Sequence, residues 1–226
     1  MNQSLARPIQ VMIVDDHALV REGLRSVIER QGDMEVCGEA EDAASAMRAV
    51  GERRPDVAVV DLTLRSGSGL ELIADLKART ESLRVLVSSM HDESLFAERA
   101  LQAGAMGYVH KQEGSQRVVD AIRCVWQGNI FLSDAMSQHL LTRLAKGNGA
   151  EKQSPIASLT NRELEVFEML GHGQSGRQIA ECLHLSPKTI DRYRENIKHK
   201  LGLTSASEVL RQATQWVLQL GKPFER

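Results

Sequence analysis

Residues 56–69 read DVAVVDLTLRSGSG, and this stretch indicates the fold of the first part of the chain. The four apolar residues at 57–60 predict a short strand that is buried on both faces, as in a parallel sheet covered by helices. Asp61 follows this strand directly, in front of a loop that contains Gly and Ser. Because the ligand crevice of an open α/β sheet lies beyond the carboxyl ends of its strands, Asp61 is a candidate functional residue.

A second strand-like segment, in which Ile9 and residues 11–14 are apolar, ends in the same way at Asp15 and Asp16. Parallel strands place their carboxyl ends at one edge of a sheet, so we expect these two carboxylates to lie near Asp61. Three unpaired carboxylates would repel one another, and a divalent cation would relieve that repulsion. Oxygen ligands without a neighbouring cluster of Cys or His favour Mg²⁺.

Strand-like and helix-like segments alternate from residue 9 to residue 126, which predicts a doubly wound α/β fold with five parallel strands. The predicted strands are 9–15, 34–39, 56–61, 84–89 and 106–110, and the predicted helices are 17–31, 42–53, 69–79, 93–103 and 115–126.

The length of 226 residues suits two domains, one of about 130 and one of about 70 residues. The alternation stops after Trp126, and the sequence GNGAEKQSP at 147–155 has the composition of a flexible linker. We therefore predict a first domain at 1–127, a connecting segment at 128–157 that contains a helix at about 133–146, and an all-α domain at 158–226.

Helix-start signals divide the all-α domain. Thr160 and Glu163 form a capping-box pattern at the start of one helix. A second helix is predicted at 175–183, and Ser186-Pro187 is typical of the start of a third. Two short helices joined by a tight turn are the signature of a helix-turn-helix.

The third helix has one apolar face, formed by Ile190, Tyr193, Ile197 and Leu201. The other side is charged, and we predict DNA contacts there: Arg192 with guanine, Asp191 or Glu195 with cytosine, Lys188, Arg194 and Lys198 with phosphates, and Thr189 beside them. An ordinary solvated amphipathic helix has the same pattern, so both interpretations stay open on this evidence.

The charge of the chain is unevenly distributed around a formal net charge of −2. Residues 1–153 hold 18 Lys and Arg against 22 Asp and Glu, a net charge of −4, whereas residues 154–226 hold 10 against 8, a net charge of +2. The second part is the better candidate for binding nucleic acid, although so small an excess is weak evidence.

Three cysteines, Cys37, Cys124 and Cys182, are far apart and include no CxxC pair. We expect them to be buried or half-buried reduced thiols rather than a disulfide or a metal site. No apolar run reaches the roughly 20 residues of a membrane span, and residues 1–8 lack the apolar segment of a secretion signal. These observations predict a cytoplasmic protein without a membrane partner.

Together these residues resemble the NarL/FixJ subfamily of two-component response regulators. The first part is similar to the receiver domain at Asp15-Asp16, Asp61, Ser89 after VLVS (85–88), Tyr108 and Lys111. The last part is similar to the LuxR-type helix-turn-helix at LTNRE (159–163), Gly173, Ile179-Ala180, SPKTI (186–190) and KLG (200–202). The resemblance covers about 9–126 and 156–220, and it implies a flavodoxin-like receiver with strand order 2-1-3-4-5.

The resemblance also implies a function. A sensor histidine kinase would phosphorylate Asp61, and this would switch dimerisation and sequence-specific binding to double-stranded DNA. Mg²⁺ would be held by Asp15, Asp16, Asp61 and the backbone carbonyl of Thr63, and Lys111 would pair with a phosphoryl oxygen. The chain would be a homodimeric transcription factor rather than an enzyme, with RNA polymerase as a further candidate partner.

Ser89 and Tyr108 would form the switch of such a receiver. The Ser89 hydroxyl would donate to the phosphoryl group, and Tyr108 would turn into the space that the loop vacates. Ser88 is a competing candidate for this hydroxyl. Thr63 and His91 occupy positions where the family varies the residues that set the lifetime of the phosphoryl group.

Some features depart from this pattern or leave alternatives. Family members commonly have proline four residues after the acceptor, where this chain has Arg65, so we expect a looser loop and altered access for phosphate.

A metal-dependent phosphatase would need an acid at Thr63, and SGSG at 66–69 is not followed by the Gly-Lys-Ser/Thr of a P-loop. We interpret His17 as a helix-start residue rather than a ligand. A closer alternative is a regulator that binds DNA independently of phosphate.

Overall fold

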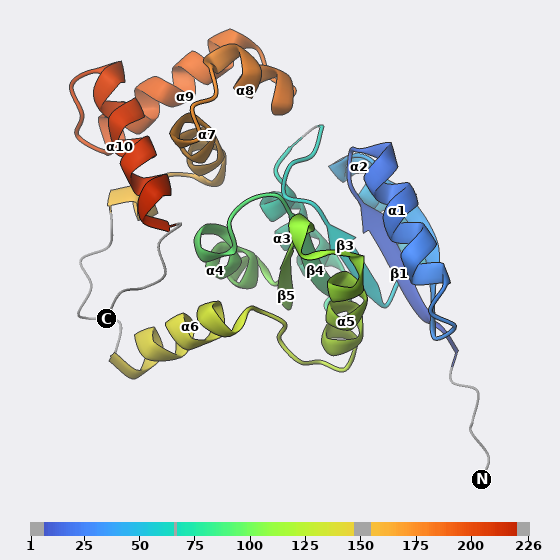
Figure 1. Ribbon diagram of the computed structural model, residues 1–226. Helices are drawn as coiled ribbons and strands as arrows, with labels where there is room; N and C mark the ends of the chain where they lie inside the picture. Colours follow the sequence, from blue (N-terminus) through green and yellow to red (C-terminus); the bar gives the residue numbers. More distant parts are fainter. Residues whose placement is uncertain (1–6, 66, 147–154, 221–226) are drawn as a thin grey trace. The chain divides into compact units, whose positions relative to one another are not determined.

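The computed structural model describes residues 7–65, 67–146 and 155–220 (Figure 1). The chain divides into two compact units, Met1–Leu140 and Leu141–Arg226, and each is described by itself. Most of the predicted linker, residues 147–154, lies outside the described residues. None of the helices formed by the described residues has the length and apolar character that a membrane crossing requires.

The first unit is a five-stranded parallel sheet with helices on both faces. Its strands are β1 (Ile9–Val14), β2 (Met34–Ala40), β3 (Val57–Val60), β4 (Arg84–Ser89) and β5 (Gly107–His110). Its helices are α1 (Ala18–Glu29), α2 (Ala43–Arg53), α3 (Gly69–Arg79), α4 (Glu93–Ala103) and α5 (Ser115–Trp126). The strand order is β2-β1-β3-β4-β5, which confirms the predicted doubly wound fold.

Helices cover the sheet from two sides: α1 packs against α5, whereas α2, α3 and α4 pack in a row (Figure 1). Beneath α1 and α5 the core joins Val11 and Leu86 of the strands to Ile28 and Ile122 of the helices, and all four side chains are fully buried. Every residue of β3 is buried, as expected for a central strand that has helices on both faces.

The segment after α5 returns to the edge of the sheet at β5. The Phe131 N–H donates to the Met106 carbonyl, and the Tyr108 N–H donates to the Phe131 carbonyl, both at 2.9 Å. The Arg117 guanidinium lies 4.5 Å from the centre of the Phe131 ring. Gly107 makes room for the pairing of Phe131 with β5, because a Cβ at residue 107 would lie 3.0 Å from the Phe131 Cβ. Phe131 therefore covers the edge that β5 would otherwise expose.

The same segment is attached to α4. The Ser133 N–H donates to a carboxylate oxygen of Glu93, the first residue of α4, at 2.9 Å. The Ser133 hydroxyl accepts from the Met136 N–H at 3.1 Å and so starts α6 (Asp134–Lys146), the helix predicted at about 133–146. The start of α6 therefore depends on a residue of the sheet domain.

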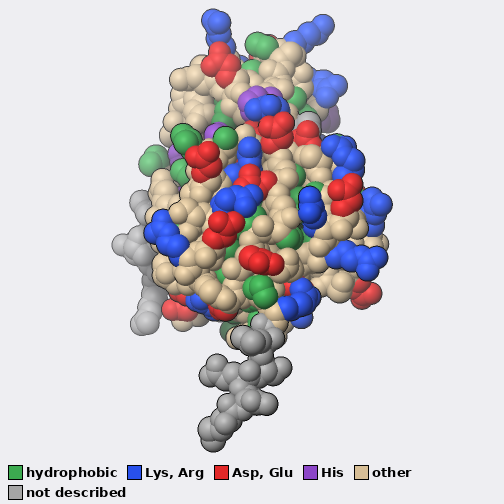
Figure 2. Space-filling view, turned by 90° about the vertical axis from the view of Figure 1, so that its right-hand side faces the viewer, with side chains coloured by type: hydrophobic (Ala, Val, Ile, Leu, Met, Phe, Trp, Pro, Cys, Tyr) green, Lys and Arg blue, Asp and Glu red, His purple; other side chains and the backbone are tan. Residues whose placement is uncertain are grey.

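Acidic and basic side chains alternate over the side of the first unit that carries α1 and β2 (Figure 2). The ion pairs there include Arg21 with Glu39 at 3.2 Å and Arg25 with Glu39 at 2.7 Å. Such mixed charge does not make the continuous basic surface that binding of phosphate backbones requires. The contacts instead hold α1 against β2.

The second unit contains the 3₁₀ turn Pro155–Ser158 and the helices α7 (Asn161–Gly171), α8 (Gly176–Cys182), α9 (Pro187–Lys200) and α10 (Ala206–Leu220). The predicted capping box of Thr160 and Glu163 is present at the start of α7. The rings of Phe167 and Trp216 lie 5.2 Å apart and join α7 to α10. The helices α8 and α9 form the predicted helix-turn-helix.

The three cysteines are reduced thiols, and two of them, Cys37 and Cys124, are half-buried as predicted. The prediction is wrong for Cys182, which is exposed. The buried positions at this end of α8 are Ile179, Ala180 and Leu183, and Cys182 lies off the face that they form.

Candidate functional site

Three carboxylates meet at the carboxyl edge of the sheet. Val14 of β1 is the register partner of Val60 of β3, so the acids that follow each strand become neighbours. Asp15, Asp16 and Asp61 are 2%, 8% and 4% exposed. Carboxylate oxygens of the three lie within 4.8 Å of one another, together with a ring nitrogen of His17. The structure therefore brings together the acids that the sequence predicted as one site.

Lys111 supplies a cation to this cluster from the residue after β5. Its Nζ lies 2.6 Å from Asp15 Oδ2 and 2.5 Å from Asp61 Oδ2. Burial disfavours the charged ammonium, but the two carboxylates outweigh burial and raise the pKa of Lys111 above its usual value. Lys111 therefore remains charged, and its Nζ bridges the carboxylates that follow β1 and β3.

Burial has the largest effect on Asp61 and raises its pKa above the usual value. The charge of Lys111 opposes this rise and the charge of Asp15 adds to it. Three oxygen donors with an excess of negative charge over Lys111 suit a hard divalent cation. The donor set therefore fits Mg²⁺.

Thr63 lies beside the acceptor candidate. Its N–H donates to Asp61 Oδ1 at 3.3 Å, and its hydroxyl is hydrogen-bonded to His91 Nε2 at 3.0 Å. The role of its backbone carbonyl as a metal ligand stays a prediction. The His91 contact places the two residues predicted to set phosphoryl lifetime in direct contact.

The loop with Arg65 in place of proline is held at both ends. Thr63 and Ser68 form an antiparallel bridge, and Arg65 lies 3.7 Å from Glu41 of the loop before α2. Gly69 allows the tight approach, because a Cβ there would lie 2.2 Å from the Asp61 carbonyl oxygen. These contacts lie at the ends of the loop, and the looser loop expected from Arg65 stays a prediction.

Ser89 and Tyr108 both contact the backbone of His91. The Ser89 hydroxyl accepts from the His91 N–H at 3.2 Å, and the Tyr108 hydroxyl donates to the His91 carbonyl at 2.8 Å. Tyr108 is 2% exposed, so its ring is buried in this structure, and its rotation on phosphorylation stays a prediction. The sequence did not indicate that the backbone N–H and carbonyl of one residue, His91, would contact the two predicted switch residues.

The third helix of the second unit, α9, begins as predicted. The Ser186 hydroxyl accepts from the Thr189 N–H at 3.1 Å, and Pro187 occupies the first helical turn. The Thr189 hydroxyl is also hydrogen-bonded to Ser186, at 2.8 Å. Ile190 and Ile197 are buried, so the opposite face of α9 is turned outward.

The remaining candidate DNA contacts lie on the outer face and one flank of α9. Lys188, Asp191, Arg192 and Glu195 are exposed, and Arg194 and Lys198 are half-buried. Asp191 lies 3.7 Å from Arg194, and Glu195 forms an ion pair with Lys198. The predicted base-reading acids are thus already paired with predicted phosphate-binding cations.

Comparisons with known proteins agree with this architecture. The family model of the response regulator receiver domain matches residues 11–123. The model described as bacterial regulatory proteins of the luxR family matches residues 157–213.

Individual relatives extend over most of the chain. The DNA-binding transcriptional activator DevR/DosR of Mycobacterium tuberculosis is 34% identical over 207 residues, which is 92% of this chain and 94% of the relative. A structure of RcsB from Salmonella enterica serovar Typhimurium bound to promoter P1flhDC in the presence of phosphomimetic BeF3⁻ covers 92% of this chain and 100% of that chain, with TM-score 0.61 and 25% identity. A structure of two RcsB dimers bound to two parallel DNAs covers 96% of this chain and 100% of that chain, with TM-score 0.56 and 25% identity.

Proposed function

The chain belongs to the response regulators that join a receiver domain to a LuxR-type DNA-binding domain, and we propose that a sensor histidine kinase phosphorylates it on Asp61 to control transcription. One observation carries this proposal. Asp61 is a buried carboxylate at the end of β3, with Lys111 Nζ at 2.5 Å and two further acids beside it. An ordinary structural ion pair does not need the two additional acids.

Asp61 acts as the nucleophile. One of its carboxylate oxygens bonds to the phosphorus of a phosphohistidine as the P–N bond breaks, and the departing imidazole takes the electron pair and a proton from water. Lys111, which contacts Asp61 Oδ2, then pairs with a phosphoryl oxygen of the product. The ammonium group thereby offsets the negative charge that the new phosphoryl group brings into the buried site.

Asp15, Asp16, Asp61 and the backbone carbonyl of Thr63 would hold Mg²⁺. A bound Mg²⁺ supplies electrostatic stabilisation of the charge on the transferred group. Asp15 and Asp16 follow β1 and Asp61 follows β3, and the register of these strands brings the acids together. The protein's contribution is therefore a preformed set of oxygen donors around the acceptor.

Ser89 and Tyr108 transmit the change. The Ser89 hydroxyl donates to a phosphoryl oxygen, and this draws the loop after β4 toward Asp61. Because Tyr108 is hydrogen-bonded to the His91 carbonyl in the same loop, displacement of His91 alters the packing of β5 and of α4, which begins at Glu93. A local charge change thus becomes a change of surface.

The DNA-binding domain reads a promoter through α9. RcsB, a structural relative, was solved bound to promoter DNA and as dimers on DNA, and this supports the same behaviour for this chain. A homodimer would place two copies of α9 on two half-sites of the duplex. This function places the chain in the cytoplasm, with DNA, the kinase and RNA polymerase as its partners.

The test uses the purified full-length chain with acetyl phosphate and Mg²⁺. We expect intact-mass spectrometry to show one added phosphoryl group on the wild type and none on Asp61→Asn. We expect phosphorylation to raise the affinity for promoter fragments and to promote dimers. Labelling of Asp61→Asn would contradict the acceptor assignment. Unchanged DNA affinity after labelling would favour a regulator whose DNA binding is independent of phosphate.

A further inference from the structure

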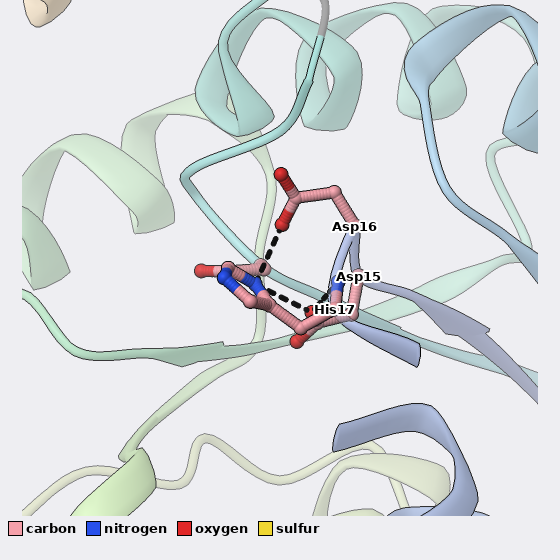
Figure 3. A group of neighbouring side chains, drawn as sticks. Asp15, Asp16 and His17 are labelled. Atoms are coloured by element: carbon pink, nitrogen blue, oxygen red, sulfur yellow. Dashed lines mark hydrogen bonds and ion pairs between the residues drawn. The ribbon is translucent and has the colours of Figure 1, made fainter. Parts of the chain in front are cut away.

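His17 lies at the start of α1 without serving as its cap. It occupies the N-cap position, where a side chain usually accepts a hydrogen bond from the first turn, but its side chain makes no such bond. Its ring instead turns back toward the acids, with Nδ1 2.7 Å from Asp16 Oδ1 and 3.4 Å from Asp15 Oδ1 (Figure 3). The helix start alone does not explain a histidine at this position.

The backbone of His17 is fixed on both sides. Its N–H donates to Asp15 Oδ1 at 2.8 Å, and its carbonyl accepts from the N–H groups of Val20 and Arg21 at 3.1 and 3.2 Å. The side chain is 65% exposed, so it lies at the mouth of the site rather than in the core. The ring can therefore adjust its position toward the acids without disturbing the packing.

The ring nitrogen lies among the groups that the proposed function assigns to a metal ion. The ligand atoms of Asp15, Asp16, Asp61 and His17 all lie within 4.8 Å of one another. Donors around a single ion, each about 2.0–2.3 Å from it, lie within about twice that distance of one another. His17 needs only a small shift to complete such a set.

We propose that His17 is a side-chain donor to this metal site and makes it favour Mn²⁺ over Mg²⁺. Mn²⁺, a first-row transition ion, accepts an imidazole nitrogen more readily than Mg²⁺, which prefers oxygen ligands and water. Three carboxylates accept either ion, so a nitrogen donor at His17 raises the preference of the site for Mn²⁺. This inference rests on the proposed function, because it assumes that the acids hold a divalent cation.

The experiment measures metal binding directly, without phosphorylation, on the full-length wild type, His17→Ala and His17→Gln. Mn²⁺ is titrated by electron paramagnetic resonance and then displaced with Mg²⁺. The electron spin echo of bound Mn²⁺ is recorded for modulation from a directly bound imidazole nitrogen. His172→Ala is the matched control, because His172 is an exposed histidine of the DNA-binding domain.

We expect wild type and His172→Ala to show imidazole modulation. We expect both His17 variants to lose it and to lower the ratio of Mn²⁺ to Mg²⁺ affinity by about tenfold or more. Bound Mn²⁺ without imidazole modulation in the wild type, or an unchanged affinity ratio in both variants, would overturn the role of His17 and leave the phosphoacceptor proposal standing. No binding of either ion by the wild type would contradict the metal site of the proposed function itself.

Discussion

The Tyr108 hydroxyl donates a 2.8 Å hydrogen bond to the backbone carbonyl of His91, and this buried contact joins β5 to the loop after β4. The donor and the acceptor are both inside the first unit, where an unmade hydrogen bond is costly. The bond connects His91, whose ring is hydrogen-bonded to Thr63, to β5. The strand β5 packs against α4, and the segment that leads into α6 pairs with its edge. Under the proposed function, this hydrogen bond couples the loop after β4 to β5.

Tyr108→Phe should lower the free energy of unfolding by about 1–2 kcal/mol, because the His91 carbonyl loses its buried donor while the ring packing is kept. Urea unfolding of the full chain measures this. Tyr193→Phe is the control, since Tyr193 lies on α9 and is only half-buried. Equal stability of Tyr108→Phe and wild type would show that water or another donor replaces the phenol.

Lys111→Met should lower the free energy of unfolding by about 3 kcal/mol in the presence of EDTA, because it leaves Asp15 and Asp61 buried without their cation. The Lys111 side chain is 13% exposed, and its Nζ lies 2.6 Å from an Asp15 oxygen and 2.5 Å from an Asp61 oxygen. Adding Asp61→Asn to this variant should restore part of the loss, because one of the two repelling charges is then removed. A loss that is the same in the single and double variants would argue against charge repulsion as the cause.

Glu163 predicts an acid-side pH dependence of the stability of the DNA-binding domain. Burial would raise its pKa, but hydrogen bonds from Lys200 Nζ at 2.6 Å and from the Thr160 N–H at 2.8 Å lower it below its usual value. A carboxyl group with a lowered folded-state pKa stabilises the fold above its unfolded-state pKa, and this contribution is lost as the pH falls through the folded-state value.

Glu163→Gln should therefore lower the free energy of unfolding at pH 7 by about 1 kcal/mol. The free energy of unfolding of this variant should also fall less steeply than that of the wild type as the pH is lowered. Thermal unfolding of the full chain between neutral and acidic pH checks this, in a Trp126→Phe background so that the fluorescence of Trp216 reports on the second unit alone. A variant whose stability falls with pH as steeply as the wild type would assign the acid sensitivity to other carboxylates.

Gly107→Ala should detach Phe131 from the edge of the sheet. The added Cβ would lie 3.0 Å from Leu86 Cδ1 and from the Phe131 carbonyl oxygen, and such overpacking costs about 1–3 kcal/mol. Hydrogen exchange at the Phe131 amide, which donates to Met106, should become faster. Gly51→Ala is the control, because nothing lies within 4 Å of a Cβ there and an alanine in α2 should stabilise by roughly 0.5–1 kcal/mol.

Arg192→Ala should lower the affinity for a specific promoter site by about 1–3 kcal/mol and relax base choice, because Arg192 is exposed on the outer face of α9. Lys198→Ala should weaken matched and scrambled DNA alike, since Lys198 is assigned to phosphate. Fluorescence anisotropy with both duplexes measures the two effects. Equal losses on both duplexes for Arg192→Ala would contradict its assignment to a base.

The five parallel strands and the convergence of three acids could be predicted from the sequence because each depends on local signals, whereas the strand order was predicted only from the resemblance to receiver domains. Buried strands that end in Asp place those residues at one edge whatever the remaining packing. The contacts of His17 could not be predicted, because the ring could have capped α1 or pointed to solvent with the same neighbours in sequence. The pairing of Phe131 with β5 was also missed, because a single bridging residue has no periodicity to detect.

The attachment of Phe131 and Ser133 to the sheet domain bears on how that domain can be studied in isolation. A fragment that stops at residue 127 would lose Phe131 and so leave the Met106 carbonyl and the Tyr108 N–H without their partner at the edge of the sheet, and unpaired backbone groups at a sheet edge are a template for pairing with a second molecule. Self-association seen with that fragment would then reflect the position of the cut. A fragment that continues through Met136 keeps Phe131 paired with the edge of the sheet, and its self-association is then a property of the receiver domain itself.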